Sequence, residues 1–391
     1  MTVALKSKFL FDATGPEVID NGAVVIDGGL IVEAGSAREV AIPPDAEVID
    51  LGDQTVMPGL FDTHTHLFEC GERRIYDGVP ETPEELALRA ARNIRRDLRA
   101  GVTSLRILGA RGFTDAVVRD CVETGVIPGP RMLIATRALH ATNGHGYDVD
   151  GFDGPEELRK AVRRNFRGGA DVIKFMATGS VDRPGGHFHE EYSREEIAVI
   201  VEEAHRIRKR VATHAIKPPE IKCCVELGVD SIEHGHMLDD ACIELMLRHG
   251  TWMVGTLAIV LDEDILAEDL AVNPCFANVE WLPRRAAAPD STRKAIAAGV
   301  KYACGTDAMH GQMAYELEAH VGIGIPEETA LLAATRNAAD CCGVIDRLGT
   351  LEAGKCADVI SVEGNPLQDI SALRRVGLVM KDGRRYDQLS E

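Results

Sequence analysis

Residues 57–66 read Met-Pro-Gly-Leu-Phe-Asp-Thr-His-Thr-His, an apolar run that ends in two histidines at alternate positions. Side chains at positions i and i+2 of a β-strand point to the same face, so His64 and His66 should leave the strand end side by side. Two converging imidazoles supply half of a zinc site, and other residues must complete it. The alternative is a strand that carries two histidines on its polar face. The rest of the chain favours the metal site.

Further apolar runs follow this stretch and alternate with helical patterns. Such alternation indicates βαβ units and a parallel sheet. One helix should begin at the capping box of Ser193 and Glu196 and extend to about Lys209, and another should begin at Ser291. Eight strands with eight crossovers predict an α/β fold, a (β/α)8 TIM-type barrel over residues 57–348. The expected strands are Gly59–His64, Val102–Ile107, Met132–Leu139, Val172–Met176, Val211–His214, Ser231–His234, Trp252–Leu257 and Lys301–Thr306.

The two ends of the chain have a different sequence pattern. Short strand-like runs lie between turn signals near both ends, at 22–26, 30–34, 46–50, 357–362 and 376–380. Neither end has enough strands to bury a face by itself. We therefore expect residues 1–56 and 349–391 to form one small composite β-sandwich domain beside the barrel.

Several expected strands end in a residue that can bind a metal ion. His214 ends the fifth strand, His234 ends the sixth, and Asp307 follows the eighth. A barrel gathers the carboxyl ends of its strands around one axis, where active sites lie, so these side chains should meet the two histidines of the first strand. Each histidine alone would more often be structural, and Asp307 could cap the next segment instead. In a metal pocket Asp307 can bind the metal and accept a proton from metal-bound water.

Lys174 lies in the fourth strand among apolar neighbours. A buried lysine is costly when charged, and it either finds a partner or loses its proton. The neutral amine can react with carbon dioxide to give an anionic carbamate that bridges two metal ions. The alternatives are a carboxylate partner or an amine that reaches solvent. The other candidate ligands favour the bridge.

Composition and charge narrow the function. The 391 residues are 45% hydrophobic and 27% charged, as in ordinary globular proteins, and the length allows a large core. The net charge of −19 and the absence of basic clusters disfavour nucleic acids and anionic membranes as partners. The ten cysteines form no Cys-x-x-Cys motif and read as reduced thiols. With no apolar signal-peptide core, we expect a cytoplasmic enzyme that acts on a small-molecule substrate.

Taken together, these motifs resemble the amidohydrolase superfamily, specifically its binuclear metal-dependent, prolidase-like and imidazolonepropionase-like branch. The resemblance covers nearly the whole chain and includes residues 232–236 (Ile-Glu-His-Gly-His), 305–308 (Gly-Thr-Asp-Ala), 334–339 and 349–358. It implies two divalent metal ions, usually zinc. One would be held by His64, His66 and Asp307 and the other by His214 and His234, with carboxylated Lys174 as the bridge.

The resemblance also implies an activity. A metal-bridging hydroxide would attack an amide carbonyl, and Asp307 would pass the proton to the leaving amine. His140, just past the third strand, would contact the substrate and polarise its carbonyl, although it could be a plain loop histidine. The substrate would be an N-acyl amino acid or a dipeptide, and barrel hydrolases of this kind commonly form homo-oligomers. The alternatives are a cyclic-amide, ester or carbamate hydrolase, a deaminase, or a scaffold without activity.

Two segments separate this chain from the dipeptidases of that family. A tyrosine that holds the substrate carboxylate commonly follows the fifth-strand His-Ala, whereas here residues 214–217 read His-Ala-Ile-Lys. Lys217 or Arg183 could supply that anchor. Met309 and His310 also stand where a small residue is expected. The glycine-flanked segment Gly185–Glu190 is either a mobile lid or a solvated loop, and its His187 and His189 are not counted as ligands.

Overall fold

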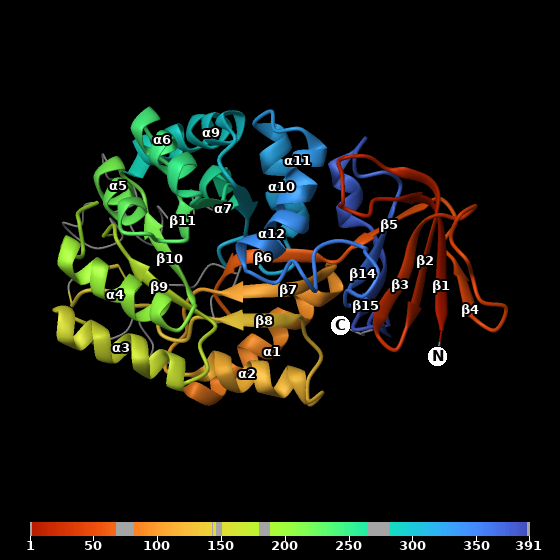
Figure 1. Ribbon diagram of the computed structural model, residues 1–391, viewed down its shortest axis with the longest axis horizontal. Coiled ribbons are helices and arrows are strands. Elements are labelled where there is room, and N and C mark those ends of the chain that lie inside the picture. Colours follow the sequence, from red (N-terminus) through yellow and green to blue (C-terminus); the bar gives the residue numbers. More distant parts are fainter. Residues whose placement is uncertain are drawn as a thin grey trace.

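The structure is a computed structural model that describes residues 2–67, 82–142, 144–145, 151–179, 188–264 and 281–388. Figure 1 shows a β-sheet at one end of the molecule and alternating strands and helices at the other. The sheet is built from both ends of the chain, whereas the alternating part comes from the middle.

The terminal segments share one eight-stranded sheet with the order β16-β15-β14-β5-β1-β2-β3, in which β4 also pairs with β1. Strand β5 lies at its centre, antiparallel to β14 and parallel to β1. Apolar side chains from both chain ends, including Leu5, Val56 and Val359, pack into one buried cluster there. The strands are β1 (Val3–Leu10), β2 (Ile19–Asp27), β3 (Leu30–Ser36), β4 (Glu47–Asp50), β5 (Gln54–Pro58), β14 (Val359–Glu363), β15 (Val376–Lys381) and β16 (Arg384–Arg385).

The middle of the chain contains eight parallel strands in two sheets, ordered β6-β7-β8 and β13-β12-β11-β10-β9. They are almost entirely buried, as expected for parallel strands that are covered by helices. Each expected strand has a counterpart, and the bounds agree best at the second, fourth and sixth. The strands are β6 (Leu60–Thr65), β7 (Val102–Ile107), β8 (Arg131–Ile134), β9 (Val172–Met176), β10 (Arg210–Ala215), β11 (Ser231–His234), β12 (Trp252–Gly255) and β13 (Tyr302–Cys304).

Hydrogen bonds join the edges of these two sheets. On one side the Asp171 amide donates to the Ile134 carbonyl at 2.7 Å, and Leu139 forms an isolated parallel bridge with Phe175. On the other side the Thr63 hydroxyl donates to the Cys304 carbonyl at 2.7 Å. Both edges of the three-stranded sheet therefore lie against edges of the five-stranded sheet.

Helices connect the strands and present apolar faces to them. The predicted capping box is confirmed in α4, where Ser193 and Glu196 bond each other's backbone amides. None of the helices in the described part of the chain is long and apolar enough to cross a membrane. The helices are α1 (Pro83–Arg99), α2 (Thr114–Glu123), α3 (Pro155–Arg167), α4 (Arg194–Arg206), α5 (Pro218–Glu226), α6 (Asp240–His249), α7 (Ala258–Leu261), α9 (Trp281–Ala298), α10 (Met313–Gly322), α11 (Glu327–Ala333), α12 (Arg336–Cys341) and the 3-10 helix η2 (Ile370–Arg374).

Two expected boundaries were wrong. Strand β8 ends at Ile134 because Thr136 adopts a left-handed φ of 59°, with its amide bound to the Asp115 carboxylate at 2.9 Å. The helix expected to begin at Ser291 begins at Trp281 and contains Pro289. Because a proline removes a backbone donor and normally breaks a helix, the sequence pattern placed this start too late.

Candidate active site

The ends of β6 and β13 bring three candidate ligands together. The Nε2 atoms of His64 and His66 lie 3.3 and 3.4 Å from Oδ1 of Asp307. One donor atom from each residue lies within 4.8 Å of the other two, which makes this group large enough and close enough to hold a cation. Two imidazoles and a carboxylate are the donor set that zinc accepts. The part of the site predicted from residues 64, 66 and 307 is therefore assembled.

The backbone holds Asp307 against β6. Its amide donates to the His64 carbonyl at 2.8 Å, and its φ of 53° is left-handed, as is the φ of 83° at Ala308. A Cβ on the preceding Gly305 would lie 2.3 Å from the His64 nitrogen, so only glycine permits this approach. Such backbone conformations are costly and persist where the surroundings enforce them, commonly at functional sites.

The side chains around Asp307 determine whether its carboxyl group is ionised. Burial alone would raise the pKa of its carboxyl, but the His64 ring and hydrogen bonds from His64 and His66 hold the pKa well below its usual range. Asp307 is therefore ionised across the neutral range and presents an anionic oxygen to the histidines.

Glu233 on β11 orients the His64 ring. Its carboxylate is fully buried and accepts from His64 Nδ1 at 2.8 Å, which leaves Nε2 directed to Asp307. Arg106 on β7 donates to both carboxylate oxygens at 2.9 and 3.0 Å. Burial opposes the charge of Glu233, but the Arg106 guanidinium lowers its pKa to about 2. A carboxylate behind a ligating histidine fixes the tautomer and the ring orientation.

His214 and His234 lie next to this group. Their ring centroids are 4.7 Å apart, and His234 is also 4.7 Å from His64. Nδ1 of His234 lies 2.8 Å from the Thr256 hydroxyl, whereas Nε2 of His214 is buried without a hydrogen-bond partner in the described chain. Burial lowers the pKa of both rings well below the usual value, so both are neutral, the form that binds metals.

The alternatives to a bridging role for Lys174 on β9 were a carboxylate partner and an amine in contact with solvent. The residue is only 1% exposed, so the amine has at most slight contact with solvent. The interactions of the described residues include no hydrogen bond or ion pair of Lys174. Burial lowers its pKa to about 8, although Glu233 and Asp307 oppose this shift. A substantial fraction of the amine is thus neutral near pH 8 and able to react as a nucleophile.

His140 is buried just past β8. Its Nδ1 lies 3.0 Å from the Ala141 carbonyl oxygen, so Nδ1 carries a proton and donates to it. Its Nε2 is buried without a hydrogen-bond partner in the described chain. Of the other candidates, Lys217 donates to the Phe188 carbonyl at 2.8 Å. Arg183 and residues 185–187 lie outside the described residues.

Sequence reasoning missed three contributors to the site. Asp62 accepts from the His64 and Thr306 amides, both at 3.1 Å, and thereby ties β6 to β13. Burial raises its pKa to about 6. Arg106 and Glu233 form the buried pair described above. Arg106 carried the same signal as Lys174, a charged residue inside an apolar strand.

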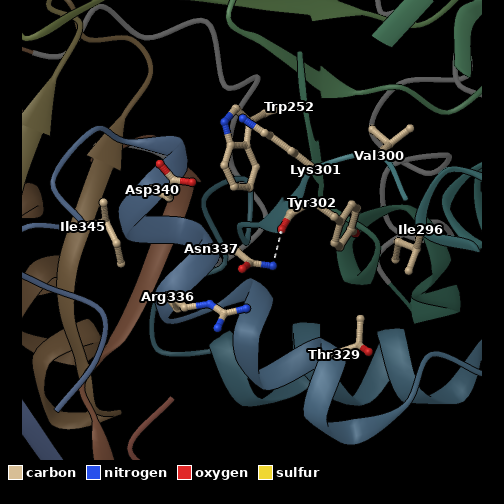
Figure 2. Close-up of a pocket in the computed structure, with 10 residues that line it drawn as sticks. All are labelled: Trp252, Ile296, Val300, Lys301, Tyr302, Thr329, Arg336, Asn337, Asp340 and Ile345. Atoms are coloured by element: carbon tan, nitrogen blue, oxygen red, sulfur yellow. Dashed lines mark hydrogen bonds between the residues drawn. The ribbon is translucent and has the colours of Figure 1, made fainter. Parts of the chain in front are cut away.

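The cavity in Figure 2 is separate from this site. It has a volume of about 410 Å³ and is lined by residues that include Trp252, Lys301 and Tyr302. Trp252 and Tyr302 are the first residues of β12 and β13, so the cavity opens at the amino ends of the strands. None of the candidate ligands lines it, so it has no part in the argument for a metal site.

Comparison with known proteins identifies the family. The chain matches the model of the amidohydrolase family over residues 55–386 and therefore belongs to that family. It is 34% identical to ochratoxinase of Aspergillus niger, over 95% of this chain and 84% of that protein. It is 26% identical to imidazolonepropionase of Pyrobaculum arsenaticum, over 88% of this chain and 86% of that protein.

A solved relative extends this likeness to the fold. The crystal structure of a Xaa-Pro dipeptidase with bound methionine in its active site is 32% identical, with a TM-score of 0.88. The match covers 99% of this chain and all of that one. The predicted resemblance is thus confirmed, and the chain is a hydrolase with mixed α/β architecture and parallel sheets.

Proposed function

We propose that this protein is a binuclear zinc-dependent hydrolase that cleaves an amide bond of an N-acyl amino acid or a dipeptide. The observation that carries the proposal is the convergence of His64, His66 and Asp307 beside two neutral histidines and an unpaired, buried lysine. The bound methionine of the solved dipeptidase supports an amino-acid-like ligand.

The proposal includes the architecture around the site. The eight central strands form one closed (β/α)8 barrel over residues 57–348, supported by the hydrogen bonds at both edges of the two sheets. Residues 1–56 and 349–391 form the second domain, supported by their shared eight-stranded sheet. The candidate histidines and Asp307 lie at or just after the carboxyl ends of the strands, where barrel enzymes carry their active sites, and Lys174 lies in the middle of β9.

The imidazole and carboxylate groups of these side chains suggest how the chain would hold two metal ions. His64, His66 and Asp307 would hold one ion, and His214 and His234 would hold the other. Addition of carbon dioxide to the neutral Lys174 amine, with release of one proton, would give a carbamate that could serve as a further anionic ligand. When bound, the ions would polarise the amide carbonyl and lower the pKa of a water molecule. The orphaned Nε2 of buried His214 fits a ligand role.

The protein groups then move the protons. Asp307 is ionised and accepts a proton at Oδ1 or Oδ2, which it returns to the nitrogen of the leaving amine. His140 would contact the substrate through Nε2, which is buried and has no hydrogen-bond partner in the described chain.

A substrate screen tests the reaction. Purified zinc-loaded protein is incubated with dipeptides and N-acyl amino acids, and new primary amine is measured, with Asp307→Asn as the control. Amine release by the wild type but not by the variant supports the proposal. No release across this panel, together with turnover of cyclic amides, esters, carbamates or aminated rings, would reject amide cleavage of amino-acid derivatives.

A further inference from the structure

His236 is a buried histidine beside the candidate metal ligands that the proposed reaction does not use. It follows His234 by two residues, and the two ring centroids are 5.4 Å apart. The residue is fully buried, and its Nε2 has no hydrogen-bond partner in the described chain. A buried polar atom without a partner costs free energy, so its retention at a site needs an explanation.

Arg284 on α9 determines which nitrogen of His236 carries the proton. Nε of Arg284 lies 2.9 Å from His236 Nδ1. A guanidinium only donates, so Nδ1 must accept, and the proton of the ring is on Nε2. The unpartnered atom is therefore an N–H donor with a fixed direction, and it requires an acceptor from outside the described chain.

Two cationic side chains lie close to this donor, and the Asp307 carboxylate also acts on the His236 ring. The Arg284 guanidinium lies over the Phe188 ring at 5.8 Å, and the Lys217 ammonium lies over the same ring at 5.7 Å. Lys217 extends from the end of β10 and Arg284 from α9, so two elements bring cations to one corner of the site. This concentration of positive charge stands out in a chain whose net charge is −19. It favours an anionic acceptor over a neutral one.

We propose that His236 and Arg284 bind a carboxylate of the substrate, with the His236 Nε2–H as a direct donor and Arg284 as the residue that orients it. The assignment rests on the proposed function and deepens it by naming the residues that would recognise the carboxylate of an N-acyl amino acid or a dipeptide. It also gives this chain a carboxylate anchor where Ile216 replaces the tyrosine of the dipeptidases. Lys217, bonded to the Phe188 carbonyl, adds charge without being the anchor.

Binding without turnover tests the anchor. In an Asp307→Asn background, isothermal titration compares a panel of N-acetyl amino acids with the matching N-acetyl amino acid amides, which lack the carboxylate. We expect the acids to bind more tightly. His236→Phe and Arg284→Met should each weaken binding of the acids about tenfold to hundredfold and leave the amides unchanged, as expected for loss of a hydrogen bond to a charged group.

Two further variants separate this role from a structural one. His236→Gln keeps an N–H donor near the position of Nε2 and should retain most of the preference for acids. Arg285→Met removes the same charge one residue further along α9, where the side chain donates to the Leu261 and Asp262 carbonyls. It should leave the preference unchanged.

The outcomes distinguish this inference from the proposed reaction. A preference for acids that is lost in both His236→Phe and Arg284→Met supports the anchor, even when the wild type hydrolyses none of the panel. Equal binding of acids and amides overturns the anchor, even when the wild type releases amine. An unchanged preference in either variant overturns it as well.

Discussion

At the scale of single residues, pairing decides what a buried charge does in this protein. Arg106, Lys174 and Glu233 are charged residues inside buried strands, and all three are buried themselves. Arg106 and Glu233 satisfy each other, so both stay charged and act on structure and orientation. Lys174 lacks such a bond, and burial lowers its pKa to about 8. In the sequence all three are charged residues within predicted strands. Only the alignment of the strands in the structure shows that Arg106 and Glu233 pair with each other, whereas Lys174 does not pair.

Removing the Lys174 amine tests the proposed bridge. Lys174→Ala should lose nearly all activity and at least one of two bound metal ions, because a methyl group cannot form a carbamate. Metal content measured by mass spectrometry, with amine release as the second readout, checks this. The matched control is Lys160→Ala, at an exposed lysine of α3. Full metal content and turnover in Lys174→Ala would refute the bridge.

Neutralising Glu233 tests its hold on His64. Glu233→Gln should weaken metal binding about 10- to 100-fold, because the amide cannot stabilise the oriented imidazole as a carboxylate does. Competition with a chelator, well below the melting temperature, measures this affinity. Glu226→Gln, at the exposed ion pair with Arg194, serves as the control. The same affinity in the Glu233→Gln variant and the wild type would show that Glu233 only supports the fold.

At the scale of elements, the sequence predicts what depends on local periodicity. The strand cores and the α4 capping box follow from alternation of apolar residues and from a four-residue cap. The early end of β8 could not be foreseen, because it depends on the Asp115 carboxylate of α2 reaching the Thr136 amide. Likewise, Glu233 and His236 lie in the motif of residues 232–236, but their roles depend on Arg106 and Arg284, which come from other elements.

Helix α10 meets the start of α7 through one buried carboxyl group. Glu316 accepts from the Leu257 and Ala258 amides, both at 2.7 Å. Burial raises its pKa from 4.5 to about 8, against the effect of these two amides. The folded state therefore keeps a proton that the unfolded state releases, and stability falls as the pH rises through this window.

The variant Glu316→Gln should remove this part of the pH dependence. Between pH 5.5 and 7.5, we expect the free energy of unfolding of the wild type to fall more than that of the variant, by at most about 1.4 kcal/mol per pH unit. Urea unfolding at both pH values measures the difference. Glu318→Gln on the same helix, which breaks the ion pair with Arg374, should follow the wild-type slope. Parallel slopes for wild type and Glu316→Gln would contradict the assignment.

At the scale of the whole molecule, one arginine connects the central strands to the terminal sheet. Arg131, the first residue of β8, lies 2.6 Å from Asp382 Oδ1 and 3.6 Å from Asp358 Oδ2. Asp382 follows β15 and Asp358 precedes β14, so this contact spans the two parts seen in Figure 1. Asp358 is nearly buried and would lose its cationic partner if Arg131 were replaced.

Replacing Arg131 should therefore destabilise the junction. For Arg131→Met we expect a loss of about 1–3 kcal/mol in the free energy of unfolding, since buried Asp358 loses its ion-pair partner and Asp382 loses a charged hydrogen-bond donor. Arg248→Met, in the exposed pair with Glu244, should cost less than about 1 kcal/mol. Denaturant unfolding of both variants makes the comparison, and equal losses would show that the junction carries no special stability.

The position of β5 also affects how the chain is made. This strand leads directly into β6 and the first two candidate ligands, yet one of its edges pairs with β14, about 300 residues further along the chain. During synthesis that edge stays open until β14 has been added, about 300 residues later. Domains generally fold as units, and an unpaired strand edge is prone to aggregation. The pairing that completes the centre of this sheet therefore comes long after β5 itself is made, and until then β5 carries an edge that another chain could occupy.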